Sequence, residues 1–447
     1  MSEPVNREPT ELDMRRVIPI FLMVFVDMLG LTLVLPLLHL YAAAYGAGPL
    51  EVGIVVAAFP LAQLIGVPMM GALSDRYGRR PLLLISQVTT CISFIMLGLA
   101  NSLALIIVSR LFDGLFGANI ATAQAALSDI TDASNRARGL GMTGAAFGLG
   151  FIFGPAIAIL SFELTDSLAA PAFTAALYSF LSILITTFMF KETHPPGRRG
   201  RASSSGITPV TLFRYLARPF VGFLLLLMFA QQFIFFGFES LLGLFTLTRL
   251  GFLGAGNAAL FLFVGIILVF VQMRAIGPWS SKFGEGRLVM AALFLLALGL
   301  LLAGATPEQP HPFYVRELVA RDLMGQAPTR AQALIVDLRV ELPANGNNGL
   351  AGVLWLALAL IPISVGAALI RPALNSLITR SVGENEYGSA LGASSALVSA
   401  ANASAPLVAA LLFQQLGASA PFAIGGALMA LLCLSSSSLS KWGPRGM

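Results

Sequence analysis

Charged side chains stand inside long apolar runs of this 447-residue sequence, where they are chemically costly. An ionised carboxylate at the centre of a membrane helix costs roughly 2.5–3.5 kcal/mol on insertion scales, so it must be paired, hydrated or functional. We predict a proton-coupling set in which Asp27 carries the proton, Arg110 is its ionic partner and Asp113 is the third member. The alternative is a static ion pair that joins two helices.

A polar stripe is predicted along the run that contains Arg110. Spacings of three and four residues place its members on one helix face, which must contact protein or water within lipid. The stripe consists of Arg110, Asp113, Gly114, Gly117, Ala121, Gln124 and Ser128.

A second polar and aromatic face lies in the later run 219–246, where Gln232, Phe235, Phe236 and Glu239 follow helical spacing. Such a face suits an aromatic pocket with one titratable group. Glu239 either binds a cation or proton, or pairs with Arg371. The expected lining of a substrate cavity comprises Gln124, Gln232, Phe236, Glu239, Arg371 and Asn375.

Membrane-spanning helices must position these residues. The chain is 57% apolar and 11% charged, against about 25% charged residues in soluble domains. A bilayer core needs roughly 20 apolar residues per helix. Twelve such runs predict an all-α membrane protein: 17–46, 50–72, 81–100, 103–128, 139–162, 168–190, 219–246, 255–277, 287–305, 350–377, 388–414 and 419–440.

Basic residues predict the orientation. With a cytoplasmic N-terminus, the short outer loops contain only Arg249, and Lys and Arg collect on the other side. We therefore expect a multi-pass protein of the plasma (inner) membrane with both termini in the cytoplasm. Orientation also explains the net charge of +5 better than nucleic-acid binding does.

The chain divides at a Pro-, Arg- and Ser-rich segment, 191–215, which predicts a flexible cytoplasmic linker between halves 1–190 and 216–447. Gly71-Ala-Leu-Ser-Asp-Arg-Tyr-Gly78 recurs weakly as Gly277-Pro-Trp-Ser-Ser-Lys-Phe-Gly284 at the same place in the second half. This repeat predicts two six-helix halves with a cavity between them.

A long outer insertion, 306–349, breaks the symmetry of the halves. Helical spacing of its apolar residues predicts one or two short amphipathic helices. The first group is Val315, Leu318, Val319 and Leu323, and the second is Leu334, Ile335 and Leu338.

The segment Gly71-Ala-Leu-Ser-Asp75-Arg76-Tyr-Gly78-Arg79-Arg80 matches the G-x-L-x-D-R-x-G-R-R signature of the major facilitator superfamily. The resemblance implies a gating motif in which Asp75 faces the N-terminal end of the eleventh helix, and Arg79 links Asp75 to Asp129. The alternative is a basic loop that only sets topology.

The run Arg110-Leu-Phe-Asp-Gly114 through Ser128-Asp129-Ile-Thr131, together with Val26-Asp27-Met-Leu-Gly30, resembles tetracycline-type drug/proton antiporters. The run 139–162 resembles the G-x8-G-x3-G-P pattern of exporters that work as antiporters in this superfamily. The matching residues are Gly141, Gly150, Gly154 and Pro155. Those pumps carry a carboxylate in the third helix where this chain has Ser93, which argues against tetracycline itself as the substrate.

Soluble enzymology has no support in the sequence, because His39, His194 and His311 are dispersed and no phosphate loop or cysteine cluster occurs. We expect no enzyme activity, cofactor or metal. His39 is interpreted as a partly buried interfacial histidine rather than a proton group. The expected function is proton-coupled export of amphiphilic or drug-like small molecules by a monomer that works by alternating access. A lipid or metabolite exporter, or a non-transporting receptor or sensor, is the alternative.

Overall fold

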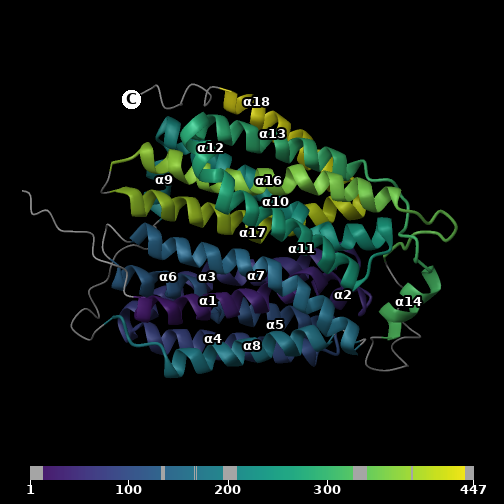
Figure 1. The fold of residues 1–447 in the computed structure, drawn as a ribbon, viewed down its shortest axis with the longest axis horizontal. Coiled ribbons are helices and arrows are strands. Elements are labelled where there is room, and N and C mark those ends of the chain that lie inside the picture. The colour runs from purple at the N-terminus through teal and green to yellow at the C-terminus, as the bar shows by residue number, and fades with distance from the viewer. Residues whose placement is uncertain are drawn as a thin grey trace, which may run out of the picture.

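The computed structural model describes residues 14–131, 136–165, 167, 169–194, 209–325, 340–383 and 386–437, and over these ranges its regular structure is helical throughout. The first group of helices lies in the lower half of Figure 1. It contains α1 (Met14–Val34), η1 (Leu35–Leu37), α2 (Leu38–Ala43), α3 (Pro49–Tyr77), α4 (Arg79–Gly98), α5 (Leu103–Phe116), α6 (Asn119–Ile130), α7 (Arg136–Thr165) and α8 (Ala169–Phe188).

The second group lies in the upper half of Figure 1, and its helices run alongside those of the first. It contains α9 (Pro209–Leu216), α10 (Pro219–Leu250), α11 (Gly254–Phe270), η3 (Val271–Ala275), α12 (Ile276–Phe283), α13 (Glu285–Gly304), α14 (Arg316–Gly325), α16 (Ala351–Arg380), α17 (Tyr387–Leu416) and α18 (Ala420–Ser435).

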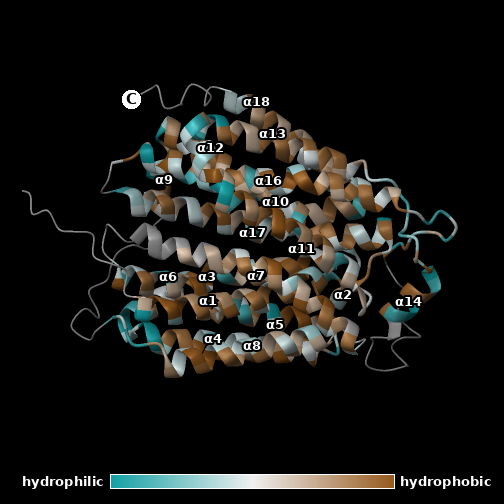
Figure 2. Cartoon of the chain, in the orientation of Figure 1, coloured by the Kyte–Doolittle hydropathy of each residue, from teal (hydrophilic) through white to brown (hydrophobic). Residues whose placement is uncertain are grey.

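The predicted membrane spans are confirmed as helices. Eleven helical segments of the described chain are long and apolar enough to cross a bilayer, and the shorter apolar helix α18 corresponds to the twelfth predicted run. Apolar residues cover these helices along most of their length, and polar residues gather toward the two ends (Figure 2). The fold is therefore an all-α membrane fold in two six-helix halves.

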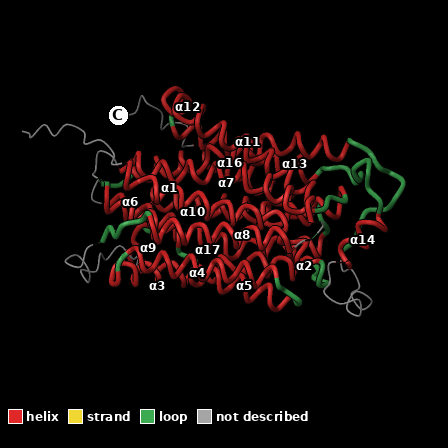
Figure 3. Tube along the Cα trace, turned by 60° about the horizontal axis from the view of Figure 1, so that its bottom comes forward, coloured by secondary structure: helices red, strands yellow, loops and turns green. Residues whose placement is uncertain are grey.

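The two ends of the bundle differ (Figure 3). One end, here named the motif end, carries the turns at Gly78 and Gly284, where positive φ angles of 107° and 79° favour glycine. The other end, named the insertion end, carries α14 and the connections around it.

Contacts between the halves gather at the insertion end. The Asn257 side chain donates a hydrogen bond to the carbonyl oxygen of Pro36, and α3 packs on α17 where Gly53 meets Pro406. At the motif end, a Cβ added to Gly71 or to Gly277 would meet nothing within 4 Å. The described chain is therefore closed at the insertion end, whereas at the motif end there is open space beside Gly71 and Gly277.

The predicted continuous polar stripe is wrong, because the fourth span is broken. Gly117 takes φ −79° and ψ 59°, a non-helical conformation that separates α5 from α6. Arg110 and Asp113 are buried before the break, whereas Gln124 is exposed after it. Because helical periodicity is interrupted at Gly117, spacing counted across the break no longer defines one face.

The insertion 306–349 is docked on the second half through its described residues. The Tyr314 hydroxyl donates to the Pro343 carbonyl oxygen at 2.8 Å, and the His311 amide donates to the Leu250 carbonyl oxygen at 3.0 Å. Helix α14 contains Leu318, Val319 and Leu323 of the first predicted apolar group and begins just after its Val315, which confirms one short helix there. The second predicted group, at 334–338, lies outside the described residues, as does linker segment 195–208.

Candidate functional site

A buried ion pair lies inside the first half. The Arg110 guanidinium approaches the Asp113 carboxylate at 3.4 Å, one helical turn away on α5, and donates to the Ser93 hydroxyl at 2.9 Å. Both charged side chains are 3–4% exposed. The ring of Phe94 lies 5.3 Å from the Arg110 Cζ, a distance suited to a cation–π contact. Ser93 thus occupies the position of the missing third-helix carboxylate and supplies Arg110 with a neutral partner.

Asp27 is separate from this ion pair. Both of its carboxyl oxygens are buried and have no hydrogen-bond partner among the described residues. Ser182 and Asn119 lie nearby but miss hydrogen-bonding geometry. The predicted Asp27–Arg110 pair is therefore wrong, because Asp113 takes that place from the same helix as Arg110. An unpartnered buried carboxyl group is strongly disfavoured as an anion, so this position suits a group that binds and releases a proton.

Two of the predicted cavity residues of the second half form hydrogen bonds to side chains of α17. The Gln232 amide on α10 donates to the Asn402 side-chain oxygen on α17 at 2.8 Å, and Ser394 donates to Asn375 at 3.4 Å. The predicted Glu239–Arg371 pair is wrong, since neither side chain has an ion-pair partner in the described ranges. Phe236 is half-buried on α10.

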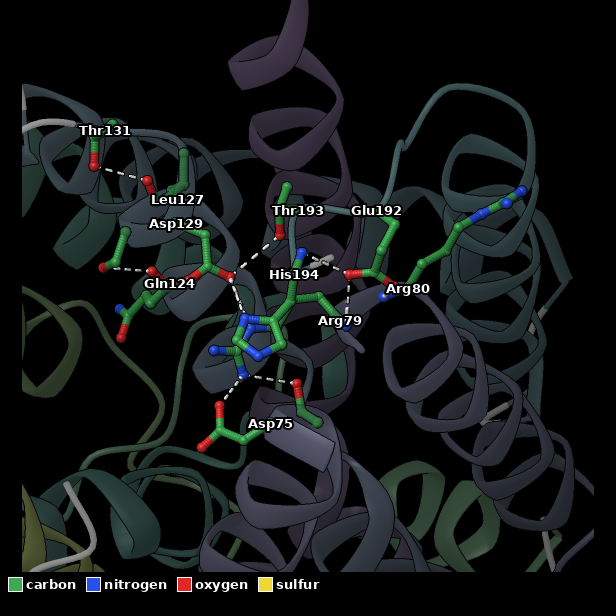
Figure 4. Close-up of polar contacts among 12 residues, drawn as sticks. Asp75, Arg79, Arg80, Gln124, Leu127, Asp129, Thr131, Glu192, Thr193 and His194 are labelled. Atoms are coloured by element: carbon green, nitrogen blue, oxygen red, sulfur yellow. Dashed lines mark hydrogen bonds and ion pairs between the residues drawn. The ribbon is translucent and has the colours of Figure 1, made fainter. Parts of the chain in front are cut away.

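The motif end carries a charge network, shown in Figure 4. Arg79 contacts the Asp75 carboxylate at 2.6 Å and donates from Nε to the Asp129 carboxylate at 2.9 Å. The predicted link from Asp75 through Arg79 to Asp129 is confirmed. Arg79 is the only partner of Asp75 within the described residues, so the predicted contact of Asp75 with the start of α17 is not made in this conformation. The side chain of Arg76 lies apart from the network, over the Tyr77 ring.

Sequence reasoning missed the residues that anchor this network from the other side. The Glu192 carboxylate accepts hydrogen bonds from the backbone amides of Arg79 at 2.9 Å and Arg80 at 3.2 Å, at the start of α4 (Figure 4). Thr193 donates to Asp129 at 3.3 Å. Carboxylates stabilise helix N-termini because free amides and the helix dipole favour negative charge there. The first residues of the predicted flexible linker are therefore fixed, which corrects that expectation.

The second half repeats part of this arrangement. Glu285 follows Gly284 at the start of α13, and its carboxylate contacts Arg380 of α16 at 2.8 Å and accepts from Ser376 at 3.2 Å. The equivalent turn after Gly78 is likewise bound to a neighbouring helix. The sequence repeat thus corresponds to a structural repeat.

A family model described as the Major Facilitator Superfamily matches residues 20–319. The chain belongs to the major facilitator superfamily. Members of this family are transporters and not enzymes, so the activity of this chain is transport.

Relatives of this superfamily chain include two kinds of transporter. The tetracycline resistance protein, class C, of Escherichia coli is 27% identical, with 87% of each chain covered. The class B protein of Escherichia coli is 30% identical over 61% of this chain and 74% of that protein. Major facilitator superfamily domain-containing protein 10 of Homo sapiens is 27% identical, with 96% and 93% covered.

Solved structures agree in fold with this superfamily chain. The human organic anion transporter MFSD10 (TETRAN) has a TM-score of 0.65 at 24% identity, covering 96% of this chain and all of that one. The nucleoside transporter NupG has a TM-score of 0.70 at 12% identity, covering 95% and 99%.

The glycines of α7 act as packing positions in this superfamily fold. A Cβ added to Gly150 would lie 2.6 Å from the Met28 Cβ of α1, and one on Gly154 would overlap the Thr32 hydroxyl. Thr32 donates to the Gly150 carbonyl oxygen at 2.7 Å. Small residues let membrane helices approach closely. Pro155 lies next in α7, and Gly141 lies earlier in the same helix.

Proposed function

We propose that this protein is a proton-coupled exporter of amphiphilic or drug-like small molecules that works by alternating access. The observation that carries the proposal is Asp27, a buried carboxyl group without a hydrogen-bond partner beside a satisfied ion pair. Its relatives named as tetracycline resistance proteins support the drug-like substrate class. The motif end is cytoplasmic in this proposal, and the insertion end faces outward.

The coupling follows from where charge is tolerated. While water is excluded, neutral Asp27 is favoured over its anion. When the surrounding helices separate and admit water, the anion is hydrated and the proton leaves. A carboxyl group that alternates between these surroundings can move a proton across the membrane in exchange for substrate.

The gating motif supplies the two conformations. In the described state the Asp75–Arg79–Asp129 network is satisfied within the first half, and a Cβ added to Gly71 would meet nothing within 4 Å. In the alternate state Asp75 would face the N-terminal end of α17, whose helix dipole attracts a carboxylate. Interactions made in one state only shift the populations by their differential energy.

Purified protein in proteoliposomes tests the coupling. We expect Asp27→Asn to abolish accumulation driven by a pH gradient and to retain some downhill exchange of the same compound. Glu51→Gln is the matched control, because it removes a carboxylate near the insertion end of α3 rather than one in the Asp27 region. Full gradient-driven accumulation by Asp27→Asn would remove Asp27 from the mechanism and leave Asp113 and Glu239 to be tested.

Organic anions are a second candidate substrate class, favoured by Arg371 of α16. This guanidinium is exposed and has no hydrogen-bond or ion-pair partner within the described ranges. A free guanidinium in a span is suited to binding a carboxylate or sulfate group. The human relative whose structure is titled an organic anion transporter is consistent with this class. Anionic and cationic compounds can be tested as competitors of transport in the parent and in Arg371→Gln. If the variant loses competition by anions alone, the protein is an anion exporter.

A further inference from the structure

A small cavity lies between the two halves at the insertion end. Residues of η1, α2 and α3 line it from one half, and residues of α10 and α11 line it from the other. It offers about 10 Å³ to the centre of a water molecule, which is room for about one water. Its polar lining consists of His39, Glu239, Ser240 and Asn257.

His39 projects into this cavity from the first half. The side chain is 3% exposed, and its Nε2 atom has no hydrogen-bond partner among the described residues. The imidazole lies directly against Gly243 of α10, where an added Cβ would overlap the ring. The expectation of a partly buried interfacial histidine is therefore wrong in degree, because contact between the halves encloses His39 fully. A buried nitrogen without a partner is rare and needs a ligand or a proton.

Glu239 lines the same cavity from the second half, one helical turn before Gly243 on α10. Asn257 is already used, since it donates to Pro36 and accepts from Thr246 at 3.3 Å. The remaining cavity walls from η1, α3 and α11 are Leu35, Pro36, Val56 and Phe261, so among the described residues no third titratable group lines it.

The charge states allowed in this cavity differ between its closed and opened forms. Between packed helices that keep out bulk water, the His39–Glu239 pair is tolerated only without net charge, either as an acid beside a neutral imidazole or as a carboxylate beside an imidazolium, and each form holds one proton. When the halves part, both groups are hydrated. Hydrated carboxyl and imidazole groups lose their protons around pH 4 and pH 6.5, so the opened site holds none above about pH 7.

We propose that His39 and Glu239 form a proton-binding site that closes the insertion end with the uptake of one proton. The proposal rests on the proposed function in placing the insertion end outside. There, closure takes a proton from the outer medium, which is the direction that proton-driven export needs. The site lies across the interface between the halves and is separate from Asp27, which lies within the first half.

Distances between spin labels across the insertion end test this site without any substrate. Asn101Cys and Gln415Cys are suitable because both positions are exposed at that end, one in each half, in a Cys91→Ser, Cys433→Ser background. In lipid nanodiscs, double electron–electron resonance gives the populations of molecules with short and with long distances between the two labels. We expect the closed-to-open ratio to fall by up to about tenfold per pH unit above about pH 7, and to level off below about pH 6.

Variants assign the pH dependence to the cavity. In Glu239→Gln and in the double variant Glu239→Gln, His39→Gln, the closed-to-open ratio should no longer fall with pH above pH 7, because the closed site no longer gains a proton. Glu51→Gln, which removes a carboxylate outside the cavity, should keep the pH dependence. The pH titration of the parent protein requires no substitution in the cavity. If its closed-to-open ratio does not vary with pH, the proposal is overturned even where a variant fails to fold.

The outcome is separable from the proposed function. Asp27→Asn should keep the slope of the label distances while it loses gradient-driven transport. A double variant that keeps the parent slope overturns the His39–Glu239 site and leaves proton-coupled export untouched. Loss of the slope in the double variant supports the site even where no exported compound has been found.

Discussion

Gly53 is the position at which the closure of the insertion end can be perturbed most directly. It lies in α3 where that helix packs on α17, and an added Cβ would stand 2.8 Å from the Pro406 carbonyl oxygen and overlap the Ala410 side chain. A backbone oxygen cannot rotate away, so Gly53→Ala must push the two halves apart. Overpacking of this kind costs about 1–3 kcal/mol in the closed state only.

That cost converts to a shift of about 5–150-fold in the closed-to-open ratio at the insertion end. The gain in helix propensity from glycine to alanine, about 1 kcal/mol, applies to both conformations and cancels. Spin labels at Asn101 and Gln415 measure the ratio directly. The expected result is a loss of most of the short-distance population in Gly53→Ala.

Gly71→Ala is the matched control on the same helix, because a Cβ there meets nothing within 4 Å in the closed state. Its short-distance population should be at least as large as that of the parent. The reasoning fails if Gly53→Ala leaves the distances unchanged, or if Gly71→Ala opens the insertion end to the same extent.

Three further predictions concern the motif end and the topology of the chain. Asp75→Asn should impair transport while insertion and expression stay normal, since Asp75 acts on the balance of two conformations; unchanged turnover in well-expressed protein would count against gating. Glu192→Gln should lower the apparent melting temperature, with a free energy loss of about 1 kcal/mol, because two α4 amides lose a charged acceptor; a melting temperature equal to that of the parent contradicts the capping role. Labelling of Ser203Cys and Ala327Cys by an impermeant outside reagent should modify only Ala327Cys, and the reverse pattern would overturn the predicted topology.

The sequence by itself determined the number and place of the helices, because bilayer thickness acts on every span through local hydropathy alone. The repeated motif placed a glycine at Gly78 and at Gly284, and both take a positive φ that favours this residue. The Arg79–Asp129 link was implied by the resemblance of the motif to the major facilitator signature.

Only the tertiary structure decided which polar groups meet. Arg110 pairs with Asp113 instead of Asp27, and Gln124 leaves the predicted stripe because Gly117 breaks the helix. His39 and Glu239 are two hundred residues apart in the chain yet line one cavity. Helical spacing fixes which residues share a face of one helix, but partners on other helices depend on how those helices rotate and pack against one another.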